Sequence, residues 1–254
     1  MSKSTLRHTL ISISVGLVFL LSLPLAGMGL YWLVTFPDVA RLADTNPPST
    51  ALMKTRMLQA LDEGRLADPE WIWVPLSQIA PALQLAVVVA EDASFYVHEG
   101  FDWEGLREAV MRNLWAGKLA RGGSTITQQL AKNLYLSSEK KLLRKAREAL
   151  ITSALEQHLT KQRILEIYLN VVEWGSDVYG AEAAARHHFD KSAYDLTTDE
   201  AALLAAILPA PRQHDPLEIT PYLFKRQQHI LWWMRKRNGD SPTLNDQLTT
   251  TLSQ

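Results

Sequence analysis

The chain has 254 residues, of which 47% are hydrophobic and 21% charged, and its formal net charge is −1. This composition is typical of a globular protein, and the near-neutral balance excludes a global positive field that would attract nucleic acid. The absence of cysteine excludes disulfides, thiolate zinc sites and a cysteine nucleophile.

The N-terminal stretch is long and uncharged. After Lys3 and Arg7, no Asp, Glu, Lys or Arg occurs before Asp38. We expect residues 9–34 to form one transmembrane helix, because about 20 apolar residues cross a bilayer. The two basic residues favour a cytoplasmic position for residues 1–8. A cleaved signal peptide is the alternative, but this apolar run exceeds the usual 7–15 residues.

The remainder is predicted to be a connector, one domain and a tail. Residues 35–70 form the connector and membrane-proximal segment, with a short helix near 51–61. The Trp71–Val74 run is either a short extended segment or an apolar patch that faces the membrane. Residues 71–240 form one domain, and the polar residues 241–254 form the C-terminal tail.

Helix signals dominate this domain. A capping box joins Thr125 to Gln128, and another joins Thr197 to Glu200. Strand-like alternation is scarce, so the predicted fold is mainly α. The expected helices are 82–90, 102–117, one that starts after Thr125, 142–159, 164–172 with Gly175 able to end it, 201–208 closed by Pro209, and 221–238 stopped by Gly239.

A carboxylate pair, Glu91-Asp92, follows the aliphatic helix 82–90. Loss of hydration at such a place raises the pKa of a carboxyl group and makes it a better proton acceptor near neutral pH. The alternative is an acidic helix end without a catalytic role. His98 lies nearby, but no second histidine stands at ligand spacing.

Two further segments could bind an anion. Gly122 and Gly123 open a helix that carries Gln128, Gln129 and Lys132, and glycines there can let backbone N–H groups reach a phosphate or a sugar. The next helix concentrates cations around Glu148. It could hold a diphosphate, or it could be a solvated face of ion pairs. The cations are Lys140, Lys141, Arg144, Lys145 and Arg147.

Two Ser-x-x-Lys matches, Ser137 to Lys140 and Ser138 to Lys141, resemble the start of a penicillin-binding nucleophile motif. The supporting Ser-Asp-Asn and Lys-Thr-Gly elements are absent from the sequence. We interpret both matches as chance.

Five ordered blocks between Trp71 and Pro216 resemble the family 51 glycosyltransferases, and the second and fourth are long and specific. The short chain and single anchor resemble the monofunctional biosynthetic peptidoglycan transglycosylases within that family. The blocks are EDASFYVHEGFD (91–102), RGGSTITQQLAKNLYL (121–136), RKAREALITSALE (144–156), KQRILEIYLNVVEWGSDVYGAEAAARHHF (161–189) and LTTDEAALLAAILPAP (196–211).

The resemblance implies a lysozyme-like helical domain with a membrane-associated lobe. It implies lipid II as substrate, inversion to a β-1,4 bond, and release of undecaprenyl diphosphate. Glu91 matches the general base that deprotonates the acceptor 4-hydroxyl, and Glu148 matches a second glutamate near the donor diphosphate. Lys132, Arg144 and Lys145 match cations that stabilise this diphosphate. The remaining positions expected to bind substrate are Asp92, Phe95, His98, Gly123, Ser124, Thr125, Gln128, Gln129 and Asn133.

The same resemblance implies a bacterial inner-membrane protein with its catalytic domain in the periplasm. Expected partners are lipid II, the nascent glycan strand, the membrane and cell-division or elongation proteins, but no nucleic acid. No cofactor is required, although Mg²⁺ or Mn²⁺ at the substrate diphosphate fits the family. A lysozyme-like glycan-cleaving enzyme and an inactive lipid II-binding scaffold are the alternatives. The chain departs from the family pattern at Glu108 and His188, where arginine and tyrosine are usual.

Overall fold

A computed structural model describes residues 16, 20, 22–24, 26–116, 123–136 and 141–239, without the side chains of residues 109, 110, 112–116 and 141. The chain divides into two units, Met1–Asp38 and Val39–Gln254. The cytoplasmic segment 1–8, the pairs Ser137/Lys140 and Ser138/Lys141 and the tail 241–254 lie wholly or partly outside the described residues.

The first unit is described only in part. Residues 26–34 are helical. Among the described residues, no helix combines the length and apolar character needed to cross a bilayer. Most of the predicted transmembrane helix before residue 26 lies outside the description, so this helix stays a prediction.

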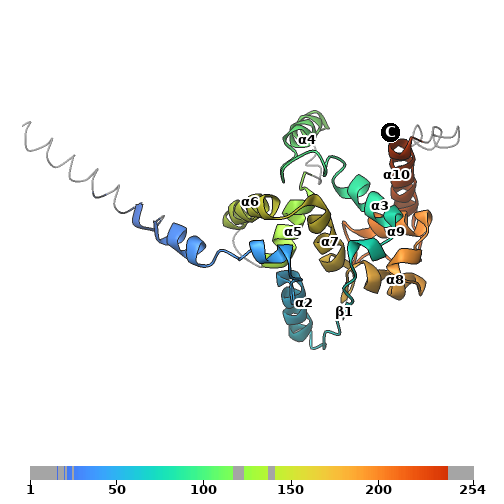
Figure 1. The fold of residues 1–254 in the computed structure, drawn as a ribbon, viewed down its shortest axis with the longest axis horizontal. Coiled ribbons are helices and arrows are strands. Elements are labelled where there is room, and N and C mark those ends of the chain that lie inside the picture. The colour runs from blue at the N-terminus through green and yellow to red at the C-terminus, as the bar shows by residue number, and fades with distance from the viewer. Residues whose placement is uncertain are drawn as a thin grey trace, which may run out of the picture. The chain divides into compact units, whose positions relative to one another are not determined.

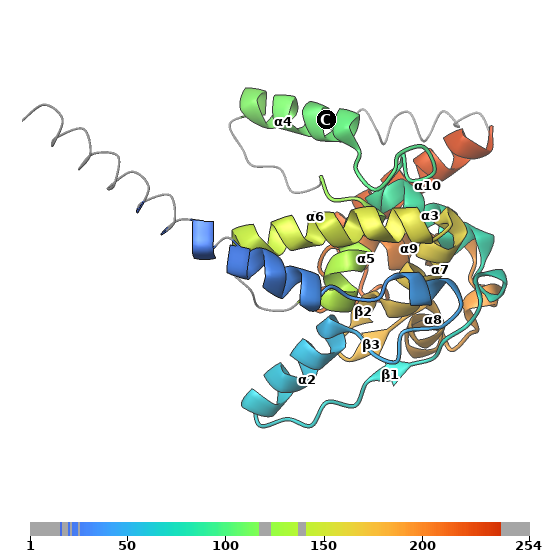
Figure 2. The same cartoon turned by 60° about the vertical axis from the view of Figure 1, so that its left-hand side comes forward.

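The second unit is mainly helical, which confirms the predicted class (Figure 1). Helices α2 and α4 extend from the central helices towards opposite ends of the unit (Figures 1 and 2). The α-helices are α2 (Ala51–Asp62), α3 (Pro81–Glu91), α4 (Trp103–Ala116), α5 (Ile126–Tyr135), α6 (Lys141–His158), α7 (Lys161–Val171), α8 (Ala181–Phe189), α9 (Thr198–Ile207) and α10 (Pro221–Asn238). Short 3-10 helices are η1 (Ala40–Ala43), η2 (Leu76–Gln78) and η3 (Ala193–Asp195).

The core joins two groups of helices. Helix α5 packs against α2, α6 and α7, while α3, α9 and α10 pack together. The buried faces come from apolar residues at helical spacing, such as Ile126 and Leu130 of α5 and Ile151 and Leu155 of α6, all fully buried. Burial of this apolar surface is the main force that holds these helices together.

A small three-stranded sheet is built from β1 (Glu70–Trp71), β2 (Glu173–Gly175) and β3 (Val178–Tyr179), in the order β1-β3-β2. Strand β1 is parallel to β3, and β2 is antiparallel to it. Asn170 fixes the segment after β1, since its side chain accepts from Val74 N and donates to Val74 O, both at 2.9 Å. The Trp71–Val74 run therefore includes a short extended segment.

Local sequence signals placed most helix ends correctly. Both capping boxes are present, at Thr125/Gln128 and Thr197/Glu200. Gly239 has a φ of 83° and stops α10 as expected. The prediction that Gly175 ends the helix from 164 is wrong: α7 ends at Val171 and Gly175 lies in β2. Helix α8 was not predicted.

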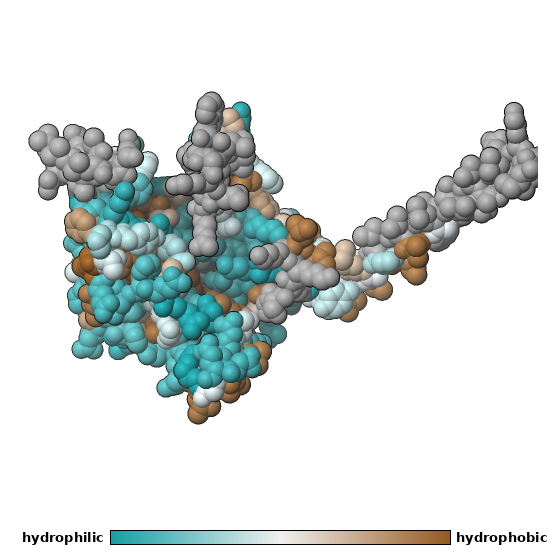
Figure 3. Space-filling model, turned by 180° about the vertical axis from the view of Figure 1, so that it is seen from behind, coloured by the Kyte–Doolittle hydropathy of each residue, from teal (hydrophilic) through white to brown (hydrophobic). Residues whose placement is uncertain are grey.

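The surface in Figure 3 is mainly hydrophilic, with hydrophobic residues in separate patches. Helix α4 carries three exposed large hydrophobic side chains, with Trp103 70% exposed, Leu106 40% and Met111 50%. These side chains have no place in the core, so α4 offers an apolar surface to solvent or to a partner.

Candidate active site

Glu91 is the last residue of α3, and its carboxylate meets groups from two other helices. Gln129 of α5 donates from Nε2 to Glu91 Oε2 at 2.9 Å. Arg226 of α10 donates from Nη2 to Glu91 Oε1 at 3.1 Å. The side chain of Glu91 is 13% exposed, so it is largely but not completely removed from water.

Both partners of Glu91 are held in turn by the fold. The Tyr168 hydroxyl of α7 donates to Gln129 Oε1 at 3.0 Å. Arg226 also donates from Nε to the carbonyl oxygen of Ala206 at 3.1 Å, at the end of α9. The carboxylate therefore has a defined orientation that depends on four helices besides its own.

Burial raises the pKa of Glu91 above its ordinary value. The hydrogen bond from Gln129 and the charges of Arg226 and Lys132 act in the opposite direction, while the neighbouring Asp92 raises the pKa further. A raised pKa gives the carboxylate the basicity required of a general base near neutral pH.

A cationic cluster lies beside this carboxylate. Lys132 of α5 interacts electrostatically with both Glu91 and Glu148, and with Arg144 and Lys145 of α6. Burial lowers the pKa of Lys132, and the two neighbouring cations lower it further. Lys145 pairs with Glu148, which is only 4% exposed. The structure thus brings together the two predicted catalytic glutamates and the three predicted cations.

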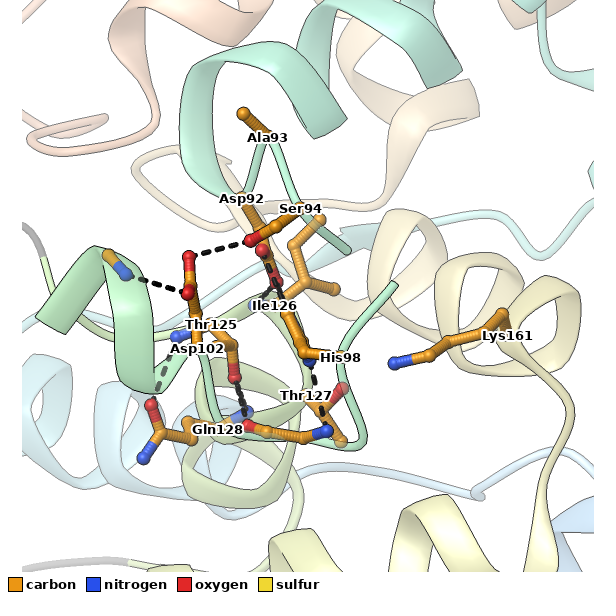
Figure 4. Close-up of polar contacts among 12 residues, drawn as sticks. Asp92, Ala93, Ser94, His98, Asp102, Thr125, Ile126, Thr127, Gln128 and Lys161 are labelled. Carbon is orange, nitrogen blue, oxygen red and sulfur yellow. Dashed lines mark hydrogen bonds and ion pairs between the residues drawn. The ribbon is translucent and has the colours of Figure 1, made fainter. Parts of the chain in front are cut away.

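Asp92 is buried, and its carboxylate bonds to two other parts of the chain (Figure 4). Its Oδ2 accepts from the backbone N of Ile126 at 2.9 Å, and its Oδ1 lies 2.9 Å from His98 Nε2. His98 Nδ1 accepts from Gly100 N at 3.0 Å, so the proton of the neutral ring is on Nε2 and is donated to Asp92. Asp92 and His98 therefore join the end of α3 to the start of α5.

Hydroxyl groups add further hydrogen bonds to this connection between α3 and α5, which we call the strap (Figure 4). Thr125 Oγ1 donates to the carbonyl oxygen of Gly100 at 2.7 Å, and Ser94 Oγ donates to Asp102 Oδ2 at 2.6 Å. Asp102 also accepts from Gly105 N at 2.8 Å, and so caps the start of α4. These bonds position the start of α5, which carries Gln129 and Lys132.

Two backbone amides in the first turn of α5 are already bonded within the protein. The N–H of Ile126 is bonded to Asp92, and that of Gln128 to Thr125 Oγ1 at 3.2 Å. Protein groups therefore satisfy these two donors, and anion binding by the remaining amides before and within the first turn stays a prediction. Gly122 lies outside the described residues.

The other predicted substrate-binding residues fall into two groups. Gly123 and Ser124 are exposed, and Gln129 is half-buried beside Glu91. Thr125, Gln128 and Asn133 are buried within or just before α5. Phe95 is fully buried, and Lys161 Nζ lies 4.7 Å from its ring centroid, so Phe95 packs within the core. Substrate contact stays a prediction for these residues.

Two residues of the site were missed in the sequence. Arg226 stands 135 positions from Glu91, within a helix that carries several other basic residues. Tyr168 stands 39 positions from Gln129, within an apolar stripe of α7 that indicated only core packing. No local pattern distinguishes either one from its neighbours.

Among the described residues, no group of three or more His, Asp or Glu side chains could hold a metal ion. The described side chains therefore do not fit a resident metal site, and Mg²⁺ or Mn²⁺ at a substrate diphosphate stays a prediction.

A comparison with protein families matches the transglycosylase model to residues 57–235, which include Glu91, Glu148 and Arg226. The chain belongs to the transglycosylase family. It is therefore a glycosyltransferase. Members of the family with high similarity to this chain carry the name biosynthetic peptidoglycan transglycosylase.

One such transglycosylase, from Nitrosospira multiformis, is 50% identical over 186 residues, which cover 73% of this chain and 81% of the relative. Another, from Herminiimonas arsenicoxydans, is 43% identical over 215 residues, 85% of this chain and 93% of the relative. A third, from Alcanivorax borkumensis, is 50% identical over 195 residues, 77% and 76% of the two chains. The similarity thus extends over most of each protein.

Proposed function

We propose that this transglycosylase polymerises lipid II into peptidoglycan glycan strands through a lysozyme-like helical domain. The growing strand, still linked to its lipid diphosphate, is transferred to the 4-hydroxyl of a lipid II acceptor. Undecaprenyl diphosphate leaves, and the anomeric carbon inverts to give a β-1,4 bond. The relatives' names support peptidoglycan as the product, and the resemblance of the five blocks supports lipid II as the substrate.

In this mechanism Glu91 accepts the proton of the acceptor hydroxyl as the oxygen attacks the anomeric carbon. The new carbon–oxygen bond forms while the bond from that carbon to the diphosphate breaks. The electron pair of the broken bond leaves with the diphosphate. The orientation of Glu91 by Gln129 and Arg226 supports this role, because a base must be held within hydrogen-bond reach of the proton that it takes.

Lys132, Arg144 and Lys145 would stabilise the negative charge that develops on the diphosphate. Fixed cations directed at developing charge lower the barrier most when water is excluded. Glu148 holds Lys145 by an ion pair and acts on Lys132, so its role is to position these cations. Because the amides of Ile126 and Gln128 are occupied, the proposed diphosphate site is assigned to the side-chain cations.

The observation that carries the proposal is the position of Lys132, whose charge acts on both Glu91 and Glu148. A cation that acts electrostatically on both carboxylates supports a single site in which a base and a charge-stabilising cluster act on the same substrate. A glycan-cleaving enzyme has no need of such a cluster, because its leaving group is a sugar hydroxyl rather than a diphosphate.

The direct test is turnover of purified lipid II by the full chain in detergent or vesicles. Wild-type protein should form polymer, and Glu91→Gln should reduce the rate by about 10²–10⁴-fold, the usual contribution of a general base. Lys132→Met, which removes a cation of the proposed diphosphate site, should also reduce the rate. Its matched control is Lys191→Met, which removes a cation that pairs with Glu200 away from this site. Release of soluble fragments from sacculi without polymer formation, or full activity in Glu91→Gln, would contradict the proposal.

The same assay run with and without a chelator tests whether Mg²⁺ or Mn²⁺ contributes. We further propose a single-pass protein of the bacterial inner membrane, with the catalytic domain in the periplasm. The exposed apolar residues of α4 support contact with a bilayer that holds the lipid substrate. Cell-division or elongation proteins are proposed as partners on the resemblance alone.

A further inference from the structure

A chain of two hydrogen bonds connects a fully buried tyrosine to the carboxylate of Glu91. The Tyr168 hydroxyl donates to Gln129 Oε1, and Gln129 Nε2 donates to Glu91 Oε2. Tyr168 belongs to α7 and is removed from solvent, so it has no route to a substrate. Its connection to the site runs through the amide of Gln129.

We propose that Tyr168 is a positioning residue that fixes the side-chain amide of Gln129 with its N–H towards Glu91, and so favours the ionised, proton-accepting form of that glutamate. The inference rests on the proposed function, because it concerns the base of that reaction. It assigns to α7 a part in the chemistry beyond packing.

The argument depends on which groups can donate. A primary amide has one acceptor end and one donor end, so the bond to the tyrosine determines which end faces the carboxylate. When Tyr168 donates to Oε1, the NH₂ group is directed at Glu91, where an ionised carboxylate can accept. If the amide turned over, its oxygen would face the carboxylate, and only a protonated Glu91 could form a bond with it.

The tyrosine is a dependable donor because it keeps its proton. Burial raises the pKa of Tyr168 well above its ordinary value, and the charges of Glu91 and Asp92 raise it further. In the turned-over arrangement the hydroxyl would lose its acceptor inside the core, and an unsatisfied buried donor is costly. Reversing the side-chain amide of Gln129 therefore costs free energy at the Tyr168 hydroxyl, away from Glu91.

Other charges act on Glu91 and are unchanged by this arrangement. They are Arg226 from α10, Lys132 from α5 and the adjacent Asp92. The first two favour the ionised carboxylate and the third opposes it. Tyr168 acts in a different way, because it controls the orientation of the neutral Gln129 amide and contributes no charge.

The test is the pH dependence of kcat/KM for polymerisation by full-length Tyr168→Phe in proteoliposomes. The acid limb should move to higher pH by about half a unit, the order expected for one lost hydrogen bond acting through an amide. Activity would then be about threefold lower on the acid limb and close to wild type on the plateau. A structural defect would instead lower the whole profile by one factor.

Tyr179→Phe is the matched control. Tyr179 is also buried, but its hydroxyl has no hydrogen-bond partner among the described residues. Its loss should leave the position of the acid limb unchanged. An equal shift in both variants would overturn the inference, and so would an unshifted profile in Tyr168→Phe.

Two further measurements keep the inference testable if Tyr168→Phe does not fold. Site-specific 3-fluorotyrosine at position 168 keeps the shape and strengthens the donor, so the acid limb should move to lower pH; no movement would contradict the inference. In a Gln129→Leu background, the fluorine should have no effect on the limb, and a persisting shift would exclude action through Gln129. Failure of the wild-type chain to polymerise lipid II would refute the proposed function instead, which separates the two outcomes.

Discussion

Arg226 Nη2 lies 3.1 Å from Glu91 Oε1, so a helix near the C-terminal end of the chain supplies the counter-charge of the proposed base. The pair links α10 to the end of α3, and these two helices also pack against α9. Assembly of the charged site therefore depends on the docking of α10.

Replacement of Arg226 should impair the reaction most at low pH. In Arg226→Gln the lowering effect of the guanidinium on the pKa of Glu91 is lost, so the base becomes protonated at a higher pH. We expect polymerisation to fall about tenfold at pH 6 and by less at pH 9, the order expected for a lost charged hydrogen bond. The measurement is the pH–rate profile.

Lys236→Ala removes a cation from the same helix that lies over the rings of Trp232 and Trp233 instead of beside Glu91. This control should keep the wild-type profile. The assigned role of Arg226 fails if its replacement lowers the rate equally at every pH.

Glu91→Gln should be more resistant to heat than the wild type at alkaline pH. Because burial raises the folded-state pKa of Glu91, folding favours the protonated form. The stabilisation is present below the unfolded value, about 4.3, and is lost as pH rises through the folded value. Glutamine resembles the protonated form, so the Tm difference should grow with pH.

In the same experiment, Glu200→Gln should change the stability in the opposite direction. Burial acts to raise the pKa of Glu200, but the hydrogen bonds from Lys191 and Thr197 outweigh it and lower the pKa. Its ionised form stabilises the fold above the unfolded pKa, so this variant should lose stability at neutral pH. A Tm for Glu91→Gln below the wild-type Tm at pH 9 would contradict the expectation that burial destabilises the ionised form of Glu91.

Removal of the Asp92 carboxylate should loosen the start of α5. Asp92→Ala leaves the Ile126 amide and the His98 ring without their acceptor, and we expect a loss of about 1–3 kcal/mol in the free energy of unfolding. Denaturant unfolding measures this loss, and hydrogen exchange should show faster exchange at Ile126. Asp195→Ala, which removes an exposed acceptor of Ser192, should change stability by about 0.5 kcal/mol or less. Unchanged protection of Ile126 in Asp92→Ala would show that the strap is dispensable.

Helix α4 should enter the lipid surface through its exposed apolar residues. In proteoliposomes with brominated lipids, Trp103 should contribute to fluorescence quenching, identified by comparison with Trp103→Phe. Leu106→Glu should reduce this quenching, because a charge on the apolar face opposes insertion. Leu217 is also exposed, at 61%, but lies outside α4, so Leu217→Glu should not reduce the quenching. Equal quenching of the wild type and Trp103→Phe would place α4 in water.

The sequence by itself determined the features that depend on neighbours along the chain. The helical class, the caps at Thr125 and Thr197 and the stop at Gly239 follow from side chains that act within one helical turn. The ordered blocks also predicted roles for Glu91, Glu148 and the three cations, because these residues lie within the first three of the five family-like blocks. The end of α7 was misplaced because Glu173–Gly175 pairs with β3, a contact that no local signal reports.

Tertiary structure alone decided how the site is oriented. It bonded Asp92 to the Ile126 amide at the start of α5, and it brought Arg226 to Glu91 and Tyr168 to Gln129. These outcomes depend on how α3, α5, α7 and α10 pack, and packing is determined by buried shape and area over the whole core rather than by spacing. The aliphatic run before Glu91 already predicted a raised pKa for this candidate base, but only the packed helices determine which groups surround its carboxylate.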